Sequence, residues 1–165
     1  MCWLLPQAAV PLTSTFLTHD WADDELGRDN HLRVSRINDR LKQSGIVTWF
    51  DEDRMSGHVR DKMAEGIGNT STVLVCMTKR YMDKVNGLDL RDNCKFELAY
   101  AFDTLGSTKI IPVVMEPRMR NPASWGRGSG TALLNGLLYV DMTSDEPKQF
   151  DAAMAAIIKN IQDRL

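Results

Sequence analysis

The run Thr72-Val73-Leu74-Val75-Cys76-Met77 is the stretch that decides the fold. It carries no charged side chain, and aliphatic residues, several of them β-branched, fill most of it. A strand with one wet face alternates apolar and polar residues, whereas a continuous apolar run of strand length predicts a strand buried on both faces. Strands of this kind are typical of parallel sheets that are covered by helices on both sides.

Four further apolar runs of strand length flank this one along the chain, and helical patterns separate them. The runs span residues 15–18, 46–50, 110–115 and, more weakly, 137–140. Apolar residues recur at helical spacing in residues 34–41, 59–67, 96–103 and 150–165. Gly45 follows the first helical pattern as a natural helix stop, and the glycine-rich residues 126–130 are expected to form a loop. This alternation predicts right-handed βαβ units and a parallel, doubly wound sheet.

The composition is that of one ordinary globular domain. The chain has 165 residues, of which 43% are hydrophobic and 25% charged, and its net charge is -2. That balance gives no reason to expect nucleic acid or an anionic membrane as a partner, and no stretch is apolar enough to span a bilayer. The three cysteines, an odd number without metal-ligand spacing, favour a reducing, cytoplasmic location over a disulfide framework.

The amino-terminal residues are expected to be a lead-in segment, residues 1–13, ahead of a single domain over residues 14–165. The segment begins with apolar residues, but it has no basic region, and Pro6 and Pro11 interrupt it. These features argue against a signal peptide.

In a doubly wound sheet, ligands bind beyond the carboxyl ends of the strands. Polar and aromatic residues follow several of the predicted strands, and the first turn of the helix near residue 93 should face the same edge. The residues placed there are His19, Asp20, Trp21, Asp51, Thr78, Asn93, Glu97 and Glu116.

The common motifs for nucleotide, metal and nucleophile chemistry do not occur. The chain has no glycine-rich dinucleotide fingerprint, no phosphate loop and no nucleophile elbow. A calcium loop starting at Asp51 would need glutamate where Lys62 stands. The three histidines have no paired spacing, so a metal site is not expected.

Glu97 is the most informative acid, because its neighbours in Cys94–Phe102 are largely apolar. Desolvation by such neighbours would suit a carboxylate to proton transfer or to stabilising a developing positive charge. The alternative, which composition alone favours, is a glutamate on the helix surface that interacts with the helix dipole. Asp51 could either cap a turn or accept a hydrogen bond from a sugar hydroxyl. Trp21 could either cover the edge of the sheet or stack on a planar ring of a ligand. For Trp49, on the strand before Asp51, the alternatives are likewise a structural role and a ligand contact.

Several segments, taken in order, resemble the boxes of TIR (Toll/interleukin receptor and plant resistance) domains. They are the strand and turn 15–20, the strand and loop 45–57, the strand and Thr-x-x-Tyr exit 71–81, the Cys-x-x-Glu-Leu stretch within 93–98, and the strand 109–114. The resemblance extends from Ser14 to Thr143. It implies a flavodoxin-like three-layer sandwich with a five-stranded parallel sheet in the order 2-1-3-4-5, in which Val73, Val75 and Ile111 are fully buried.

TIR domains of one kind cleave the nicotinamide–ribose bond of NAD, and those of the other kind are scaffolds that associate with further TIR domains in immune signalling. The resemblance places the glutamate of the cleaving kind at Glu97 and the loop aspartate at Asp51. NAD would then be the substrate, with no tightly bound cofactor, and other copies would be partners in an active homo-oligomer. The residues expected to contact NAD are His19, Asp20, Trp21, Trp49, Asp51, Thr78 and Asn93.

The sequence departs from the family pattern in two places. Asn93 stands where many NAD-cleaving members have an aromatic residue, and the carboxy-terminal Phe-Trp box of animal receptors is missing. Three hypotheses follow: an NAD-consuming enzyme, which we favour; a non-catalytic scaffold that would use the loop from Asp51 to Arg60; and a receiver-like module with an acidic metal site. The product of NAD cleavage stays open.

Overall fold

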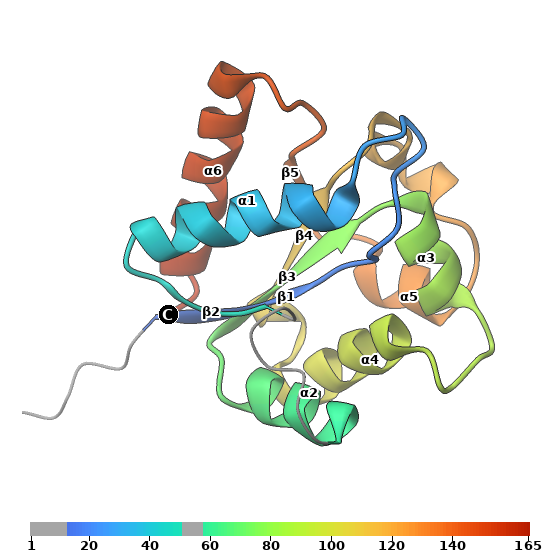
Figure 1. The fold of residues 1–165 in the computed structure, drawn as a ribbon. Helices are drawn as coiled ribbons and strands as arrows, with labels where there is room; N and C mark the ends of the chain where they lie inside the picture. The colour runs from blue at the N-terminus through green and yellow to red at the C-terminus, as the bar shows by residue number, and fades with distance from the viewer. Residues whose placement is uncertain (1–12, 51–57) are drawn as a thin grey trace, which may run out of the picture.

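The structure is a computed structural model, and it describes residues 13–50 and 58–165. Its centre is a five-stranded, wholly parallel sheet in the order β2-β1-β3-β4-β5, as predicted (Figure 1). The strands are β1 Ser14–Thr18, β2 Val47–Trp49, β3 Thr72–Met77, β4 Ile110–Val114 and β5 Val140–Asp141.

Helices cover both faces of this sheet and complete the three layers of a flavodoxin-like fold (Figure 1). One face is covered by α1 (Asn30–Gln43) and α6 (Pro147–Gln162). The other is covered by α2 (Val59–Gly68), α3 (Lys79–Asn86), α4 (Asn93–Leu105) and α5 (Ser129–Leu134). Within residues 58–165, short 3₁₀ turns occupy Ser107–Lys109, Pro117–Arg120 and Pro122–Ser124.

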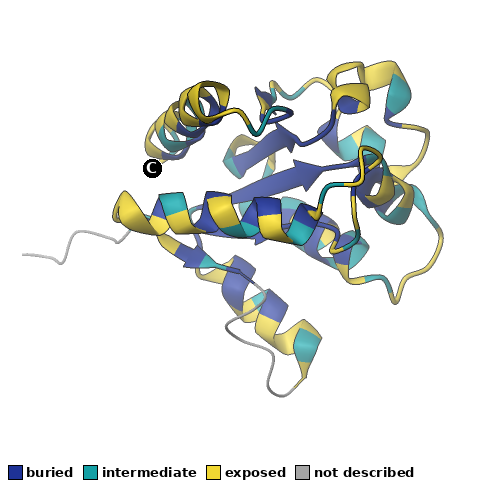
Figure 2. Cartoon of the chain, turned by 45° about the horizontal axis from the view of Figure 1, so that its top comes forward, coloured by how far each residue is buried: buried dark blue, intermediate teal, exposed yellow. Residues whose placement is uncertain are grey.

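The apolar run that predicted the fold is the middle strand. Every residue of β3 is buried, and the strand pairs with β1 through Phe16↔Val73 and with β4 through Val73↔Ile110. Val73 and Val75 are completely buried, and Ile111 is 1% exposed, which confirms the predicted core. Figure 2 shows the buried strands enclosed by helices whose outer surfaces are exposed.

Successive residues of β1 point to opposite faces of the sheet, and this alternation decides where its last residues lie. Phe16 packs with the core under α2 to α5, and Leu17 packs with the core under α1 and α6. Thr18 therefore lies on the α4 side, and His19 lies on the α1 side.

Two parts of the second half differ from expectation. Helix α3, which buries Tyr81, Met82 and Val85, was not expected, because the apolar spacing at residues 79–86 is too short to indicate a helix. The predicted strand 137–140 is observed only as the two residues Val140–Asp141, because this edge strand pairs with β4 alone.

The glycine-rich stretch 126–130 is only partly a loop. Helix α5 begins at Ser129, directly after Gly128, whose φ of 151° lies in the region that favours glycine. A Cβ on Gly130 would lie 2.3 Å from Val85 Cγ2. The glycine therefore allows α5 to contact α3 at close range, which a local pattern of flexible residues does not reveal.

Most of the expected lead-in segment, residues 1–12, lies outside the described residues, and so does Asp51. Within residues 13–50 and 58–165, no helix has the length and apolar character needed to cross a membrane.

Candidate functional site

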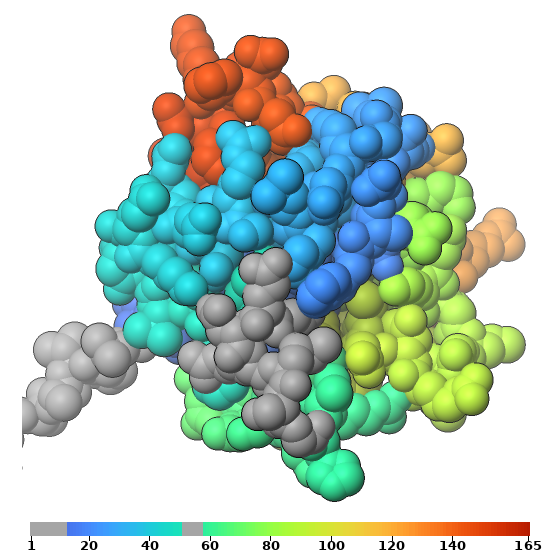
Figure 3. Space-filling model, in the orientation of Figure 1, coloured from blue at the N-terminus to red at the C-terminus, as the bar shows by residue number. Residues whose placement is uncertain are grey.

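The candidate site lies where β1, β3 and β4 end. His19 and Asp20 follow β1, Thr78 follows β3, and Glu116 follows β4 by two residues, while Glu97 approaches from α4. In the space-filling view the loop after β1, drawn in blue, forms part of the surface between α1 and helices α3 and α4 (Figure 3). The edge predicted from the sequence therefore carries these residues.

Glu97 is positioned by the start of α4. Asp92 caps this helix, since its side chain accepts a hydrogen bond from Lys95 N at 3.0 Å. Glu97 follows one turn later, where it is 3% exposed, and its Oε2 accepts a hydrogen bond from the Thr18 hydroxyl. The alternative expectation of a helix-surface glutamate is wrong, because the helix turns this side chain toward the end of β1.

Tyr81 lies beside this pair. Its side chain is completely buried, and its hydroxyl oxygen is 3.2 Å from Thr18 Oγ1. Burial raises the pKa of Tyr81 well above its usual value, and the nearby Cys94 raises it further, so the phenol keeps its proton. The Thr78 hydroxyl accepts a hydrogen bond from Tyr81 N at 3.1 Å, so this predicted ligand residue caps α3.

Asp20 is buried in an ion-pair cluster. Its carboxylate pairs with Lys84 Nζ and, at 3.2 Å, with Arg80 Nε, both from α3. Burial alone would raise the pKa of Asp20, but the hydrogen bond and charge of Lys84, together with the hydrogen bond from Arg80, outweigh burial and hold that pKa below its usual value. Asp20 is therefore an ionised group that fastens α3 to the loop after β1.

On the α1 side of the sheet, four aromatic rings stack on one another beyond the end of β1. His19 Nε2 lies 2.8 Å from His31 Nδ1, and the indole of Trp21 stacks on His31 with ring centroids 3.8 Å apart. Phe50 completes the stack, 5.3 Å from His19 between ring centroids. Burial, followed by the charge of His31, lowers the pKa of His19 to about 4, so the imidazole is neutral at physiological pH. Trp21 remains 48% exposed.

His31 and Phe50 were not predicted to lie at this edge. A usable signal was the position of His31 in the first turn of the helix after β1, because a βα unit returns that turn toward the end of the strand.

Three other residues were predicted to contact the ligand, and none of them lies among the stacked rings or the partners of Glu97 that the structure describes. Trp49 lies on β2, on the same face of the sheet as Thr18 and Glu97 but on the far side of β1, where a Cβ on Gly66 would be 2.6 Å from its Cε3. Asn93 is exposed at the first position of α4. Asp51 lies outside the described residues.

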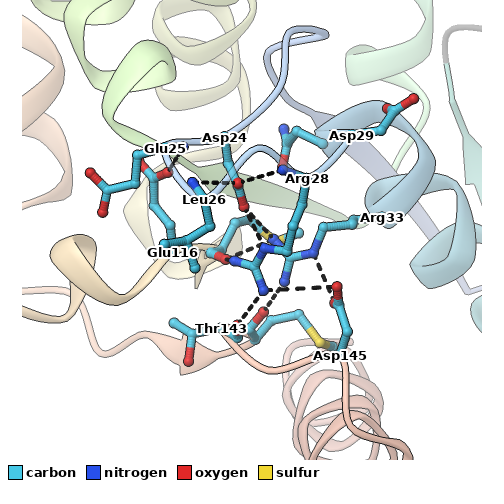
Figure 4. A network of polar contacts seen from close by, with 12 residues as sticks. Asp24, Glu25, Leu26, Arg28, Asp29, Arg33, Glu116, Thr143 and Asp145 are labelled. Carbon is cyan, nitrogen blue, oxygen red and sulfur yellow. Dashed lines mark hydrogen bonds and ion pairs between the residues drawn. The ribbon is translucent and has the colours of Figure 1, made fainter.

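A buried polar network holds the loop that carries His19 to Trp21 (Figure 4). Asp24 Oδ2 accepts from Arg28 Nε at 2.8 Å and from Arg33 Nη1 at 3.3 Å. Arg33 also donates to the backbone oxygens of Met115 and Met142, at 2.7 and 2.8 Å, and so ties the loop to the segments that follow β4 and β5. Since two carboxylates, including that of Asp145, face the two guanidinium groups, the network is close to neutral.

Glu116 attaches the same loop to α3. Its Oε2 accepts from Glu25 N at 2.9 Å, and its Oε1 accepts from Lys79 N, the first residue of α3. The carboxylate therefore has a structural role at the amino end of this helix, where negative charge is favourable.

Asp20, Glu97 and Glu116 carry buried carboxylates at the edge where a parallel sheet binds ligands. Asp20 and Glu116 are bound to α3, and Glu97 accepts from Thr18. Trp21, on the loop after β1, is 48% exposed beside them. A carboxylate in that position can stabilise a developing positive charge. Among the described residues, no three histidine, cysteine, aspartate or glutamate side chains are grouped so as to hold a metal ion.

Comparison with known proteins agrees with this fold. The structure of a prokaryotic SEFIR domain is similar, with a TM-score of 0.63, 17% identity, and 90% of this chain and 98% of that chain covered. The TIR domains of the activated Roq1 resistosome, which recognises the pathogen effector XopQ, match with a TM-score of 0.62 and 15% identity over 90% and 99% of the two chains. A search of curated proteins gave no significant match.

The family model for the TIR domain matches residues 16–158, which is most of the chain and includes β2 to β5 and the last three residues of β1. This match covers the segments whose order and spacing resembled TIR boxes. The chain therefore belongs to the TIR domain family.

Proposed function

We propose that this TIR domain cleaves NAD at the nicotinamide–ribose bond, as an NAD hydrolase or ADP-ribosyl cyclase in immune or cell-death-like signalling. The observation that carries the proposal is the position of the Glu97 carboxylate, which lies at the end of β1, at the ligand-binding edge of the sheet, and accepts a hydrogen bond from Thr18.

The chemistry needs one acid at this place. Loss of nicotinamide leaves an oxocarbenium-like ribose, and a carboxylate close to the sugar stabilises that charge, as in glycoside hydrolysis. Nicotinamide departs as a neutral amine, so no general acid is required. NAD is the substrate here rather than a bound cofactor, and the exposed face of Trp21 offers a stacking surface for one of its planar rings.

The Glu97 carboxylate must become accessible before NAD can be cleaved, and association between copies of the protein could expose it. At 3% exposure the carboxylate cannot touch a ribose until neighbouring groups move. TIR domains typically associate with other TIR domains, and we propose that association between copies of this chain supplies the rearrangement. Turnover per molecule should then rise steeply with protein concentration or crowding.

The test is to incubate the purified protein with NAD at several protein concentrations and to follow nicotinamide release. Glu97→Ala should lower the rate by about a hundredfold or more, and Glu97→Gln nearly as much, because the amide keeps the shape but loses the charge. Glu65→Gln, at an exposed glutamate on α2, is the matched control and should cleave at the parent rate. Cleavage by Glu97→Ala at the parent rate would exclude the proposed role.

A non-catalytic scaffold is the second candidate, and the near-complete burial of Glu97 favours it. This protein would then act through homotypic binding between TIR domains alone. Concentration-dependent assembly in analytical ultracentrifugation, without nicotinamide release from the assembled protein, would support the scaffold and reject the enzyme.

A further inference from the structure

Two hydroxyl groups form a chain that ends on Glu97. Tyr81 Oη lies 3.2 Å from Thr18 Oγ1, and Thr18 Oγ1 donates to Glu97 Oε2. The three residues come from α3, β1 and α4, and none of them is more than 3% exposed.

The direction of the chain follows from the protons available. Thr18 Oγ1 is the donor to Glu97 Oε2, and a threonine hydroxyl has only one hydrogen to donate. The Thr18 oxygen is then an acceptor, and the Tyr81 hydroxyl is the donor that faces it. Because the buried phenol keeps its proton, this donor is present throughout the physiological pH range.

Both members of the chain are attached to rigid parts of the fold. Thr18 is the last residue of β1 and pairs with Val75 on the central strand. Tyr81 is in the first turn of α3, where the Thr78 cap holds its backbone nitrogen. A glutamate side chain has three rotatable bonds, and hydrogen bonds from such fixed donors restrict where its carboxylate can point.

We propose that Thr18 and Tyr81 are positioning residues, whose hydroxyl chain holds the Glu97 carboxylate in the orientation in which its charge meets the ribose. This inference rests on the proposed NAD cleavage. Neither residue touches the substrate, and both act through Glu97.

The first test measures the kinetics of NAD cleavage by the whole protein, at a protein concentration at which the copies associate. Thr18→Val should lower kcat by about tenfold to a hundredfold while KM changes less than about threefold, because a hydrogen bond to a charged group is lost and NAD contacts are not. Tyr81→Phe, which removes only the outer hydroxyl, should lower kcat by about threefold to tenfold. Thr18→Ser keeps the donor and should restore kcat to near the parent value.

Thr15→Val is the matched control. Thr15 is another buried threonine of β1, and its hydroxyl donates to the backbone oxygen of Thr72 at 3.2 Å, far from the chain that ends on Glu97. This variant should unfold more easily than the parent and keep its kcat. If Thr18→Val keeps the parent kcat, or if Thr18→Ser is as impaired as Thr18→Val, the positioning role is overturned.

The second test does not use NAD. In a double-mutant cycle followed by urea unfolding, Thr18→Val should lower the folding equilibrium constant about fivefold more in the parent than in a Glu97→Ala background. Cleavage by the parent without this coupling overturns the positioning role alone. Coupling in a parent that cleaves no NAD at any concentration overturns the proposed function, and with it the catalytic purpose of the chain.

Discussion

Replacing Arg33 with methionine tests whether the buried network in Figure 4 holds the fold together. Arg33 is 5% exposed and donates to the carboxylates of Asp24 and Asp145 and to the backbone oxygens of Met115 and Met142. Methionine keeps much of the hydrocarbon volume and removes all of these donors.

The loss can be estimated contact by contact. Arg28 also donates to Asp24 and to the Met115 oxygen, so each of these acceptors keeps at least one partner. The Met142 oxygen loses the Arg33 donor, and a buried acceptor left unsatisfied costs about 1–3 kcal/mol. Removing one member of a buried ion pair costs about 3–5 kcal/mol, and here the second guanidinium places the cost at the lower end. The two contributions together should lower the free energy of unfolding by about 4–6 kcal/mol.

Urea unfolding followed by far-ultraviolet circular dichroism measures this loss. Arg40→Met is the control on the same helix, because the pair between Arg40 and Asp151, 2.9 Å long, is largely exposed. An exposed pair contributes about 1 kcal/mol or less, so the control should remain close to the parent. If Arg33→Met loses no more stability than Arg40→Met, the network does not stabilise the fold in the way described.

Two further expectations concern α2 and the buried imidazole. Gly66→Ala should destabilise the protein by about 1–3 kcal/mol, because its Cβ would lie 2.6 Å from Trp49 Cε3, whereas Gly68→Ala, with no atom within 4 Å, should be neutral or stabilising by up to about 1 kcal/mol. Equal melting temperatures for the two variants would contradict this packing. Folding lowers the pKa of His19 from 6.5 to about 4. Below pH 6.5 the unfolded chain therefore binds a proton that the folded protein does not, and the free energy of unfolding falls by about 3 kcal/mol between pH 6.5 and pH 4. His19→Phe should lose less stability than the parent between pH 7 and 4.5 in urea titrations, and parallel pH profiles would disprove the assignment.

The strands were predictable because a strand that is buried on both faces has apolar residues at successive positions in the sequence. Residues 72–77 and 110–115 are apolar without interruption, and the structure places them side by side at the centre of the sheet. The start of α4 was predictable for a similar reason, since Asp92 is a typical helix cap. Elements whose stability depends on contacts elsewhere were not predictable in this way: α3 has only eight residues, and α5 contains Gly130, which must fit against Val85.

The sequence by itself therefore determined the class of fold, the sheet edge where the polar residues gather, and the helix that carries Glu97, because apolar periodicity and helix caps are properties of neighbouring residues. Only the tertiary structure decided what Glu97 touches. Thr18 and Tyr81 are 79 and 16 positions away from it along the chain, and they meet at one point because parallel strands and their crossover helices all return to the same edge. The burial of Glu97 and the stacking of His19 on His31 were decided in the same way, since both depend on strand order and register rather than on the residues next to them in sequence.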